Sequence, residues 1–229
     1  MKLAIMQPYL FPYIGYFQLI HASDLFLIYD DVAYIKQGYI NRNTILSENG
    51  VTRFTVPVPG RSSNKLISDL EFSTDVKKIL KTIEQSYSKA TYFETVFPLV
   101  RQILESKDRS IASVCMTSYQ RIFSYLGRDK QFKKTSELDY RRTESAIDRL
   151  IILCHKFEGD CYINALGGRS LYTKSDFAAQ GVELKFLDPM PVMYPQGNTH
   201  FVPNLSIVDV LMNCSPKEVV NLMTQYELR

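Results

Sequence analysis

Two short, uninterrupted apolar runs near the N-terminus constrain the fold of this chain more than any other feature. They occupy residues 3–5 and 25–29. Runs of this kind are typical of parallel strands that are buried on both faces. Between them, residues 17–20 predict the start of a short helix that ends near Ala22. A strand, a helix and a second strand in this order predict a parallel α/β sheet with right-handed crossovers.

A hairpin and a group of helices are expected next. Ile45-Leu46 and residues 51–58 predict two antiparallel strands around Asn49-Gly50, because glycine supplies the positive φ of a tight turn. Residues 66–72 predict one more strand. Apolar residues then recur at helical spacing in three segments, which predicts a helical insertion over about residues 73–127. Its helices are expected from a cap at Ser73 or Thr74 to Tyr87, over 94–105 and over 110–126.

The α/β pattern resumes after this insertion. Strands are expected near residues 132–136, 161–164 and 182–187, and helices over 143–157, 171–180, from Asn204 or Ser206 to Asn213, and after the capping box Ser215-Pro216-Lys217-Glu218. The chain is long enough to bury a full core. We therefore predict one α/β domain over residues 1–229, with an open, mostly parallel, Rossmann-like sheet that carries the hairpin and the helical insertion.

The composition is typical of a soluble globular protein, with 45% hydrophobic and 22% charged residues. The formal net charge of +3 is too small to indicate nucleic-acid binding. The four cysteines form no C-x-x-C pair, which indicates buried free thiols in a reducing compartment. No apolar run approaches the ~20 residues of a membrane span, and the N-terminus begins directly with a strand. We therefore expect a cytoplasmic protein without a membrane span.

Residues 6–16, which we call the aromatic segment, differ from an ordinary connector. The segment holds two prolines, Gly15 and several rings, among them Tyr9, Tyr13 and Tyr16. A connector between a strand and a helix is ordinarily short and polar. This one is apolar and stiff. We therefore predict that it lines a ligand site at the carboxyl edge of the first strand, where open α/β sheets bind their ligands.

Two carboxylates, Asp30 and Asp31, follow the second strand at the same edge. Adjacent residues of a strand point to opposite sides, so at most one of them is expected to face a pocket. That carboxylate can hold a metal ion, an amine or a hydroxyl; the alternative is a pair of solvated carboxylates at a strand end. No spacing of His, Cys and Asp matches a zinc site, and a Mg²⁺ site stays open.

Lys36, Asn41, Arg42 and Asn43 form an unusually polar stretch. Arginine offers a planar fork that binds carboxylate or phosphate, and asparagine both donates and accepts hydrogen bonds. Together these side chains suit a polyanionic or sugar-like ligand. The alternative is a surface loop with turn-forming asparagines.

His200 is the most suggestive of the three histidines, because it lies in a second segment rich in proline and aromatic residues. A loop histidine can act as a general base at neutral pH, or it can be a hydrogen-bonded structural residue. His21 and His155 lie at a helix end and on an amphipathic helix. Asp209 follows a helix-capping serine by three residues, a spacing that predicts a capping role. The chain has no G-x-S-x-G, Walker A or G-x-G-x-x-G motif.

These same stretches resemble the WbqC-like protein family. The resemblance is carried by residues 6–20, 29–32, Lys36 with 41–43, and 201–209, and it covers essentially the whole chain. It implies a bacterial protein of O-antigen and other surface-polysaccharide gene clusters, and a cytoplasmic enzyme that places a small acyl or aminoacyl group, such as glycine, on a sugar. One departure is Tyr39, where the family often has Trp, so an aromatic wall is kept.

A second similarity concerns Pro12-Tyr13-Ile14-Gly15-Tyr16, which looks like the H-x-G-H loop of nucleotidylyltransferases with both histidines replaced by tyrosine. In those enzymes the histidines stabilise a phosphate transition state. Tyrosine, with a pKa near ~10, can donate a hydrogen bond to a phosphate but supplies no imidazolium charge.

The leading hypothesis is an acyl or aminoacyl transferase that acts on an amino sugar or nucleotide sugar, with an acyl or aminoacyl carrier protein as the partner that delivers the group. The alternatives are a nucleotidylyltransferase-like enzyme and a non-catalytic sugar-nucleotide binding protein. No cofactor, metal ligand or nucleic-acid partner is identified. The candidate catalytic residues are Asp30, Lys36 and His200, and the candidate substrate-binding residues are Gln7, Tyr9, Tyr13, Gly15, Tyr16, Asp31, Asn41, Arg42, Asn43 and Asn204.

Overall fold

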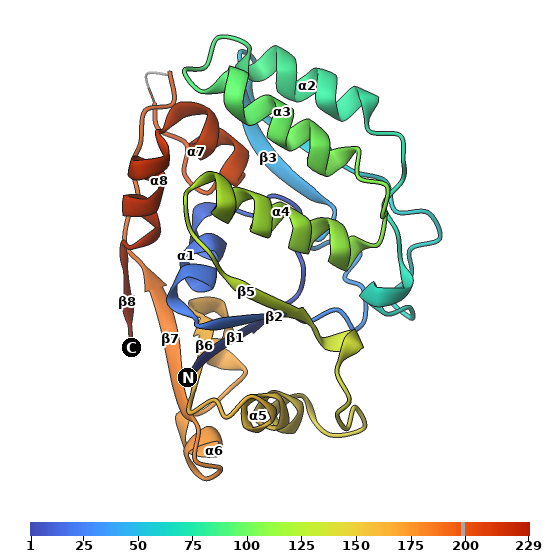
Figure 1. The fold of residues 1–229 in the computed structure, drawn as a ribbon, viewed down its shortest axis with the longest axis vertical. Coiled ribbons are helices and arrows are strands. Elements are labelled where there is room, and N and C mark those ends of the chain that lie inside the picture. Colours follow the sequence, from blue (N-terminus) through green and yellow to red (C-terminus); the bar gives the residue numbers. More distant parts are fainter. Residues whose placement is uncertain (198–199) are drawn as a thin grey trace.

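A six-stranded sheet forms the centre of the computed structural model, which describes residues 1–197 and 200–229. Five strands are parallel, and the last is antiparallel to its neighbour. The prediction of an open, mostly parallel α/β sheet is therefore confirmed (Figure 1). In spatial order, the strands are β5 (Gln131–Lys134), β2 (Leu25–Ile28), β1 (Lys2–Met6), β6 (Cys161–Ala165), β7 (Glu183–Pro189) and β8 (Tyr226–Leu228).

The strand order reverses at β1. The chain passes from β1 to β2 and then to β5 on one side, and it returns to the other side of β1 with β6 and β7. Ligands of open α/β sheets bind beside the carboxyl ends of the strands near such a reversal. The aromatic segment leaves the carboxyl end of β1, so the topology places it near this position.

Helices cover both faces of the sheet. Ala4 and Phe26 pack in one core with α1 and α4, whereas Leu3 and Leu27 pack in a second core with α5 and α6 (Figure 1). All four residues of β2 are buried, which explains its uninterrupted apolar run. The helices are α1 (Ile14–Ala22), α2 (Lys77–Tyr87), α3 (Phe93–Leu104), α4 (Ile111–Tyr125), α5 (Ala146–Lys156), α6 (Lys174–Ala178), α7 (Ile207–Asn213) and α8 (Pro216–Met223).

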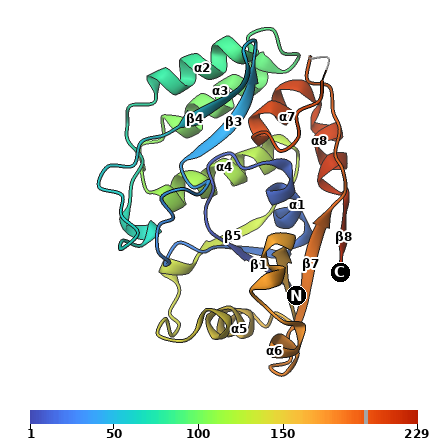
Figure 2. The same cartoon turned by 180° about the vertical axis from the view of Figure 1, so that it is seen from behind.

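The predicted hairpin is confirmed as a separate antiparallel pair, β3 (Arg42–Ser47) and β4 (Gly50–Thr55). It begins earlier than the sequence pattern indicated, so Arg42 and Asn43 belong to a strand and not to the preceding loop. Helix α2 packs against β3, and α3 packs against α4 and α7. Figure 2 shows the hairpin beside α2 and α3, away from α5 and α6. That residues 1–229 act as one domain, with 73–127 as a helical lobe, stays a prediction.

Other boundaries differ from the predictions for local reasons. The prediction of a strand at residues 66–72 is wrong, because this stretch holds a 3-10 turn at Ile67–Asp69. Its backbone N–H groups bond to isolated residues of other segments, such as Val32 and Arg109, and no ladder forms. Helix α1 starts three residues earlier than expected, and α2 has no side-chain cap. Strand β8 was not predicted, because three residues carry too little pattern.

Two further predictions are confirmed. The capping box of α8 is present: the Ser215 hydroxyl accepts a hydrogen bond from the backbone of Glu218, and the Glu218 carboxylate accepts one from the backbone of Ser215. All four cysteines are buried as free thiols.

Within residues 1–197 and 200–229, no helix is both long and apolar enough to cross a membrane.

Asp209 is a fully buried carboxyl whose role differs from the predicted one. The cap of α7 is supplied by the Ser206 hydroxyl, which accepts a hydrogen bond from the backbone of Val208. The Asp209 carboxyl accepts hydrogen bonds from the hydroxyls of Tyr87 at 2.5 Å and Tyr194 at 2.8 Å. Burial raises the pKa of Asp209, and these hydrogen bonds offset part of that rise. The carboxyl thereby joins α2, α7 and the segment before α7.

We expect Asp209→Asn to alter how stability depends on pH. The folded-state pKa of Asp209 is raised, so its stabilising contribution is fully present below the unfolded pKa of about 4 and is lost as pH rises through the folded-state pKa. Between pH 4 and 8, the free energy of unfolding of the natural protein should therefore fall relative to that of the variant. Urea denaturation measures this difference, with Asp75→Asn at an exposed position as the control. A difference that stays constant with pH would contradict it.

Candidate functional site

An open cavity of about 640 Å³ lies between the aromatic segment and the hairpin. It is lined by Tyr9, Pro12, Tyr13, Gln37, Tyr39, Arg42, Asn43, Thr44, Arg53 and Asn204. Five of these residues are substrate-binding candidates from the sequence: Tyr9, Tyr13, Arg42, Asn43 and Asn204. The structure therefore brings together candidates that are separated by up to 195 positions in the chain. Gln37, Thr44 and Arg53 were not identified from the sequence.

The carbonyl oxygen of Phe11 holds the parts of this cavity together. It accepts hydrogen bonds from Asn43 Nδ2 at 2.8 Å and from Ser206 Oγ at 2.7 Å. The backbone of Phe11 has φ +46°, a left-handed conformation that is rare for a bulky residue. Backbone bonds from Ser206 to Thr44 and from Ile207 to Pro12 add to the same junction. The aromatic segment, β3 and the start of α7 thus meet at one point.

Tyrosine rings form one wall of the cavity. The rings of Tyr9 and Tyr39 lie 6.2 Å apart between centroids, and Tyr9 packs 5.5 Å from buried Tyr16. The backbone of Tyr9 is fixed by Tyr119, whose hydroxyl accepts from the N–H of Tyr9 and donates to its carbonyl. Burial raises the pKa of Tyr9 and of Tyr13. These phenols are therefore neutral at physiological pH and can donate hydrogen bonds to a ligand.

Two arginines, Arg42 and Arg53, also line the cavity. Thr44 pairs with Arg53 across the hairpin, and Arg42 lies two residues before Thr44, so both arginines share one face of the hairpin. Arg42 Nε donates to the carbonyl of Gly38 at 2.9 Å, which orients its guanidinium group. Among residues 1–197 and 200–229, those that line the cavity include no carboxylate and no histidine. The cavity therefore combines positive charge with aromatic faces, a combination that suits an anionic ligand.

Gly15 makes room for the ring of Tyr13. A Cβ atom at position 15 would lie 2.3 Å from Tyr13 Cε2 and 2.9 Å from Tyr13 Cζ. Gly15 is the second residue of α1, where its conformation alone does not require glycine. Glycine is needed at position 15 because of this close approach, which allows the Tyr13 ring to line the cavity.

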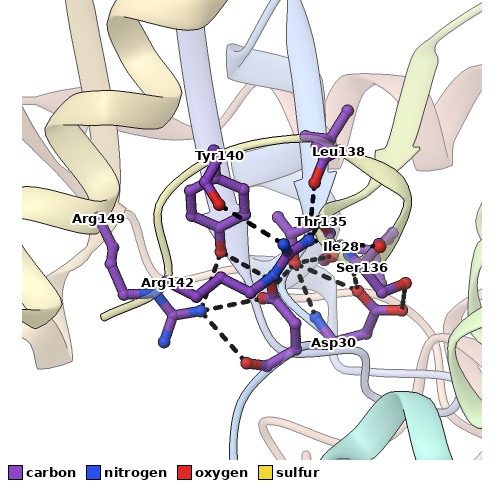
Figure 3. A network of polar contacts seen from close by, with 9 residues as sticks. Ile28, Asp30, Thr135, Ser136, Leu138, Tyr140, Arg142 and Arg149 are labelled. Atoms are coloured by element: carbon purple, nitrogen blue, oxygen red, sulfur yellow. Dashed lines mark hydrogen bonds and ion pairs between the residues drawn. The ribbon is translucent and has the colours of Figure 1, made fainter. Parts of the chain in front are cut away.

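Asp30 and Asp31 lie in a separate polar network, outside the cavity lining (Figure 3). Asp30 is 1% exposed and accepts from the backbone N–H of Ser136 at 2.8 Å and from its hydroxyl at 2.6 Å. Thr135 donates to Asp30 at 3.2 Å and to Asp31 at 2.7 Å. The two carboxylates meet at Thr135, because β2 ends at Ile28 and the alternation of a strand no longer applies.

Asp31 is also the buried anion of a charge cluster. It accepts from Arg142 Nε at 2.7 Å, Arg149 Nη2 at 3.2 Å and the Tyr140 hydroxyl at 2.7 Å. Arg142 further donates to the carbonyls of Thr135 and Leu138. The cluster fastens the end of β2 to the segment after β5 and to α5. Every oxygen of both carboxylates accepts at least one hydrogen bond from the protein, which indicates a structural role for this pair.

The remaining candidates occupy different environments. Lys36 is exposed and precedes Gln37, which lines the cavity. Asn41 is buried, and its Nδ2 donates a hydrogen bond to the carbonyl of Val56 at 2.7 Å. This bond joins the residue just before the hairpin to the residue just after it. Gln7 is half-buried, and its carbonyl accepts from the Tyr16 hydroxyl at 2.7 Å. His200 is exposed and is not among the residues that line the cavity.

Comparison with known proteins identifies relatives over nearly the whole chain. The model of the WbqC-like protein family matches residues 7–221. The uncharacterized protein Rv1507c of Mycobacterium tuberculosis (strain ATCC 25618 / H37Rv) is 31% identical over 217 residues, which is 93% of either chain. No solved structure matches this chain.

We expect Asp31→Asn to destabilise the fold by about 3 kcal/mol, because it leaves Arg142 and Arg149 without their anion. Urea denaturation measures the change. Asp139→Asn, at an exposed position of the same segment, is the matched control and should alter stability by less than about 0.5 kcal/mol. A variant of Asp31 that keeps its full stability would contradict the structural role assigned to this carboxylate.

Gly15→Ala tests the link between α1 and the cavity wall. Alanine favours a helix over glycine by up to about 1 kcal/mol, so we expect the free energy of unfolding to stay equal or to rise. The added Cβ should displace the Tyr13 ring, which aromatic ¹³C NMR detects as a change in the Tyr13 signals. In a Tyr13→Ala background, the remaining tyrosine signals should respond little to the same substitution. An unmoved Tyr13 signal in the single variant would refute the link.

Proposed function

Because this chain belongs to the WbqC-like protein family, we propose that it is a transferase that places a small acyl or aminoacyl group on an amino sugar or nucleotide sugar. The single observation that carries the proposal is the cavity that Arg42 and Arg53 line together with tyrosine rings. The phosphates of an anionic sugar derivative can bind the arginines, and the faces of its sugar or base rings can stack on the tyrosines. We place this role in surface-polysaccharide biosynthesis in the cytoplasm.

Each wall has a separate part in binding. Arg42 and Arg53 bind the phosphates or a carboxylate through charge-assisted hydrogen bonds. Tyr9, Tyr13 and Tyr39 stack on the sugar or the base, since stacking on aromatic rings tolerates different ligands. Asn204 is exposed at the rim and supplies an amide that both donates and accepts. Lys36 adds positive charge to the segment that borders the cavity.

The transfer needs one proton acceptor. The amine nitrogen of the sugar attacks the carbonyl carbon of an activated acyl donor, a C–N bond forms, and the bond from that carbon to the leaving group breaks. The proton that the nitrogen loses passes to a base and then to the leaving group. We assign the base to His200, an exposed residue of the segment that ends in Asn204. Asp30 is not assigned this step, because its oxygens already accept hydrogen bonds.

The alternative of nucleotidyl transfer is favoured by the strand order, which matches a doubly wound dinucleotide-binding sheet over its five parallel strands. The aromatic segment argues against it. Of the two tyrosines that occupy the histidine positions of an H-x-G-H loop, Tyr13 lines the cavity, whereas Tyr16 is buried and donates to the carbonyl of Gln7. Release of pyrophosphate from ATP and Mg²⁺ would support this alternative, and the lack of any ATP binding by calorimetry would exclude it.

The direct test incubates the purified protein with UDP- or dTDP-linked amino sugars and an activated acyl or glycyl donor, including donors on a carrier protein. Mass spectrometry should show a gain of one acyl or glycyl group on the sugar. His200→Gln should lower the rate at neutral pH and leave binding of the sugar unchanged. If the sugar gains no mass with any donor, while the protein still binds it, the protein is a binding protein and the proposed reaction is wrong.

Arg42→Gln and Arg53→Gln test the anion site. Each is expected to weaken binding of a UDP-amino sugar about tenfold, since a charge-assisted hydrogen bond contributes about 1.5–3 kcal/mol. Calorimetry measures the dissociation constants. Arg128→Gln makes the same charge change at an exposed position outside the cavity and should have little effect. Equal losses in all three variants would indicate a non-specific charge effect and would refute the site.

A further inference from the structure

A second hollow, which we call the apolar groove, lies next to the cavity. It has a volume of about 550 Å³ and shares Tyr13 and Asn204 with the cavity lining. Its other walls come mainly from α1 and from the segment before α7, and they are almost entirely apolar: Ile14, Pro189, Met190, Pro191, Val192, Met193, Phe201, Pro203 and Leu205 are among them. Met193 is 71% exposed and Met190 is 44% exposed, so part of this apolar wall faces solvent.

One polar side chain of α1, Gln18, interrupts the apolar lining. Its Nε2 donates to the carbonyls of Leu222 at 2.9 Å and Gln225 at 3.0 Å, which fixes the orientation of the amide. Gln18 is 0% exposed, and its Oε1 has no hydrogen-bond partner among the described residues. A buried acceptor without a partner destabilises a protein by about 1–3 kcal/mol. Because Gln18 is among the residues that line the groove, a ligand whose N–H group reaches Oε1 would supply the missing partner.

We propose that the apolar groove binds the pantetheine arm of an acyl thioester and that Gln18 Oε1 accepts a hydrogen bond from one of its amide N–H groups. This inference rests on the proposed transferase function and names its donor. A pantetheine arm is a narrow chain of methylene and methyl groups interrupted by two amides. The flexible methionines can adapt to such a chain. A plain fatty acyl chain would fill the same walls but would leave Oε1 without a donor.

The placement also explains how the two substrates meet. Tyr13 and Asn204 line both the groove and the cavity, so an arm whose thioester end lies beside these two residues places its carbonyl next to the anion site. The sugar nitrogen then attacks the carbonyl carbon. The C–N bond forms, the C–S bond breaks with its electron pair on sulfur, and the proton lost by nitrogen ends on that sulfur. The products are an amide and a free thiol, with no oxidant or reductant involved.

The test measures binding of S-acetylpantetheine to the full-length protein by NMR titration. A second probe replaces each amide N–H with an ester oxygen and keeps the chain length. The natural protein should bind the amide probe at least fivefold more tightly than the ester probe. In Gln18→Met this preference should disappear. No saturable binding of the amide probe, or equal binding of both probes by the natural protein, would overturn the inference.

A surface variant guards against loss of folding in Gln18→Met, because Gln18 also bonds to the end of α8. Met193→Lys places a charge in the exposed part of the groove and should weaken the amide probe at least fivefold. Leu171→Lys, at a residue that is 66% exposed outside the groove, is the matched control and should bind normally. Unchanged binding in Met193→Lys would contradict the assignment of the groove.

The result separates this inference from the proposed function. Transfer to the sugar from donors without a pantetheine arm, together with no binding of S-acetylpantetheine, would refute the inference and leave the transferase intact. Binding of the amide probe through Gln18, without transfer to any sugar, would support the groove and refute the transferase.

Discussion

The hydrogen bonds to the carbonyl of Phe11 are the interaction on which the candidate site depends. Asn43 donates to this oxygen from β3, and Ser206 donates to it from the start of α7. Together they stabilise a left-handed backbone at Phe11, a conformation that costs of order 1–3 kcal/mol for a non-glycine residue. The relative positions of the tyrosine wall and the arginine wall follow from this junction, so the strain and the cavity have a common origin.

Charges of opposite sign are divided between two regions. The buried carboxylates at the end of β2 are bound by Arg142, Arg149 and nearby hydroxyls, and they fasten the sheet to α5. The arginines of the hairpin line a cavity that has no carboxylate among its described lining residues. Because the structural cluster is neutralised internally, its carboxylates offset little of the positive charge of the cavity. This division favours binding chemistry in the cavity over acid–base chemistry by Asp30 or Asp31.

The sequence was sufficient to predict the elements that have strong local patterns. The strands β1 and β2, the Asn-Gly hairpin and the capping box of α8 all form, although the hairpin starts earlier than predicted. The placement of Asp30 and Asp31 could not be predicted, because their partners at 135–149 lie more than 100 positions away. Arg53 could not be predicted as a cavity residue, because an exposed arginine on a hairpin strand has no local sequence pattern that indicates a ligand site. Its pairing with Thr44 identifies it, once the register is known.

The junction at Phe11 also has a consequence for how the protein matures. The oxygen of Phe11 and the hydroxyl of Ser206 are separated by 195 positions, which is nearly the length of the chain. Because the chain emerges from the ribosome with its N-terminus first, β1, α1 and the hairpin can form long before α7 is synthesised. Contacts of such sequence separation form late and slowly. During synthesis, the arginines and tyrosines of the cavity therefore exist before Ser206, and we expect the cavity to form as one of the last events of folding.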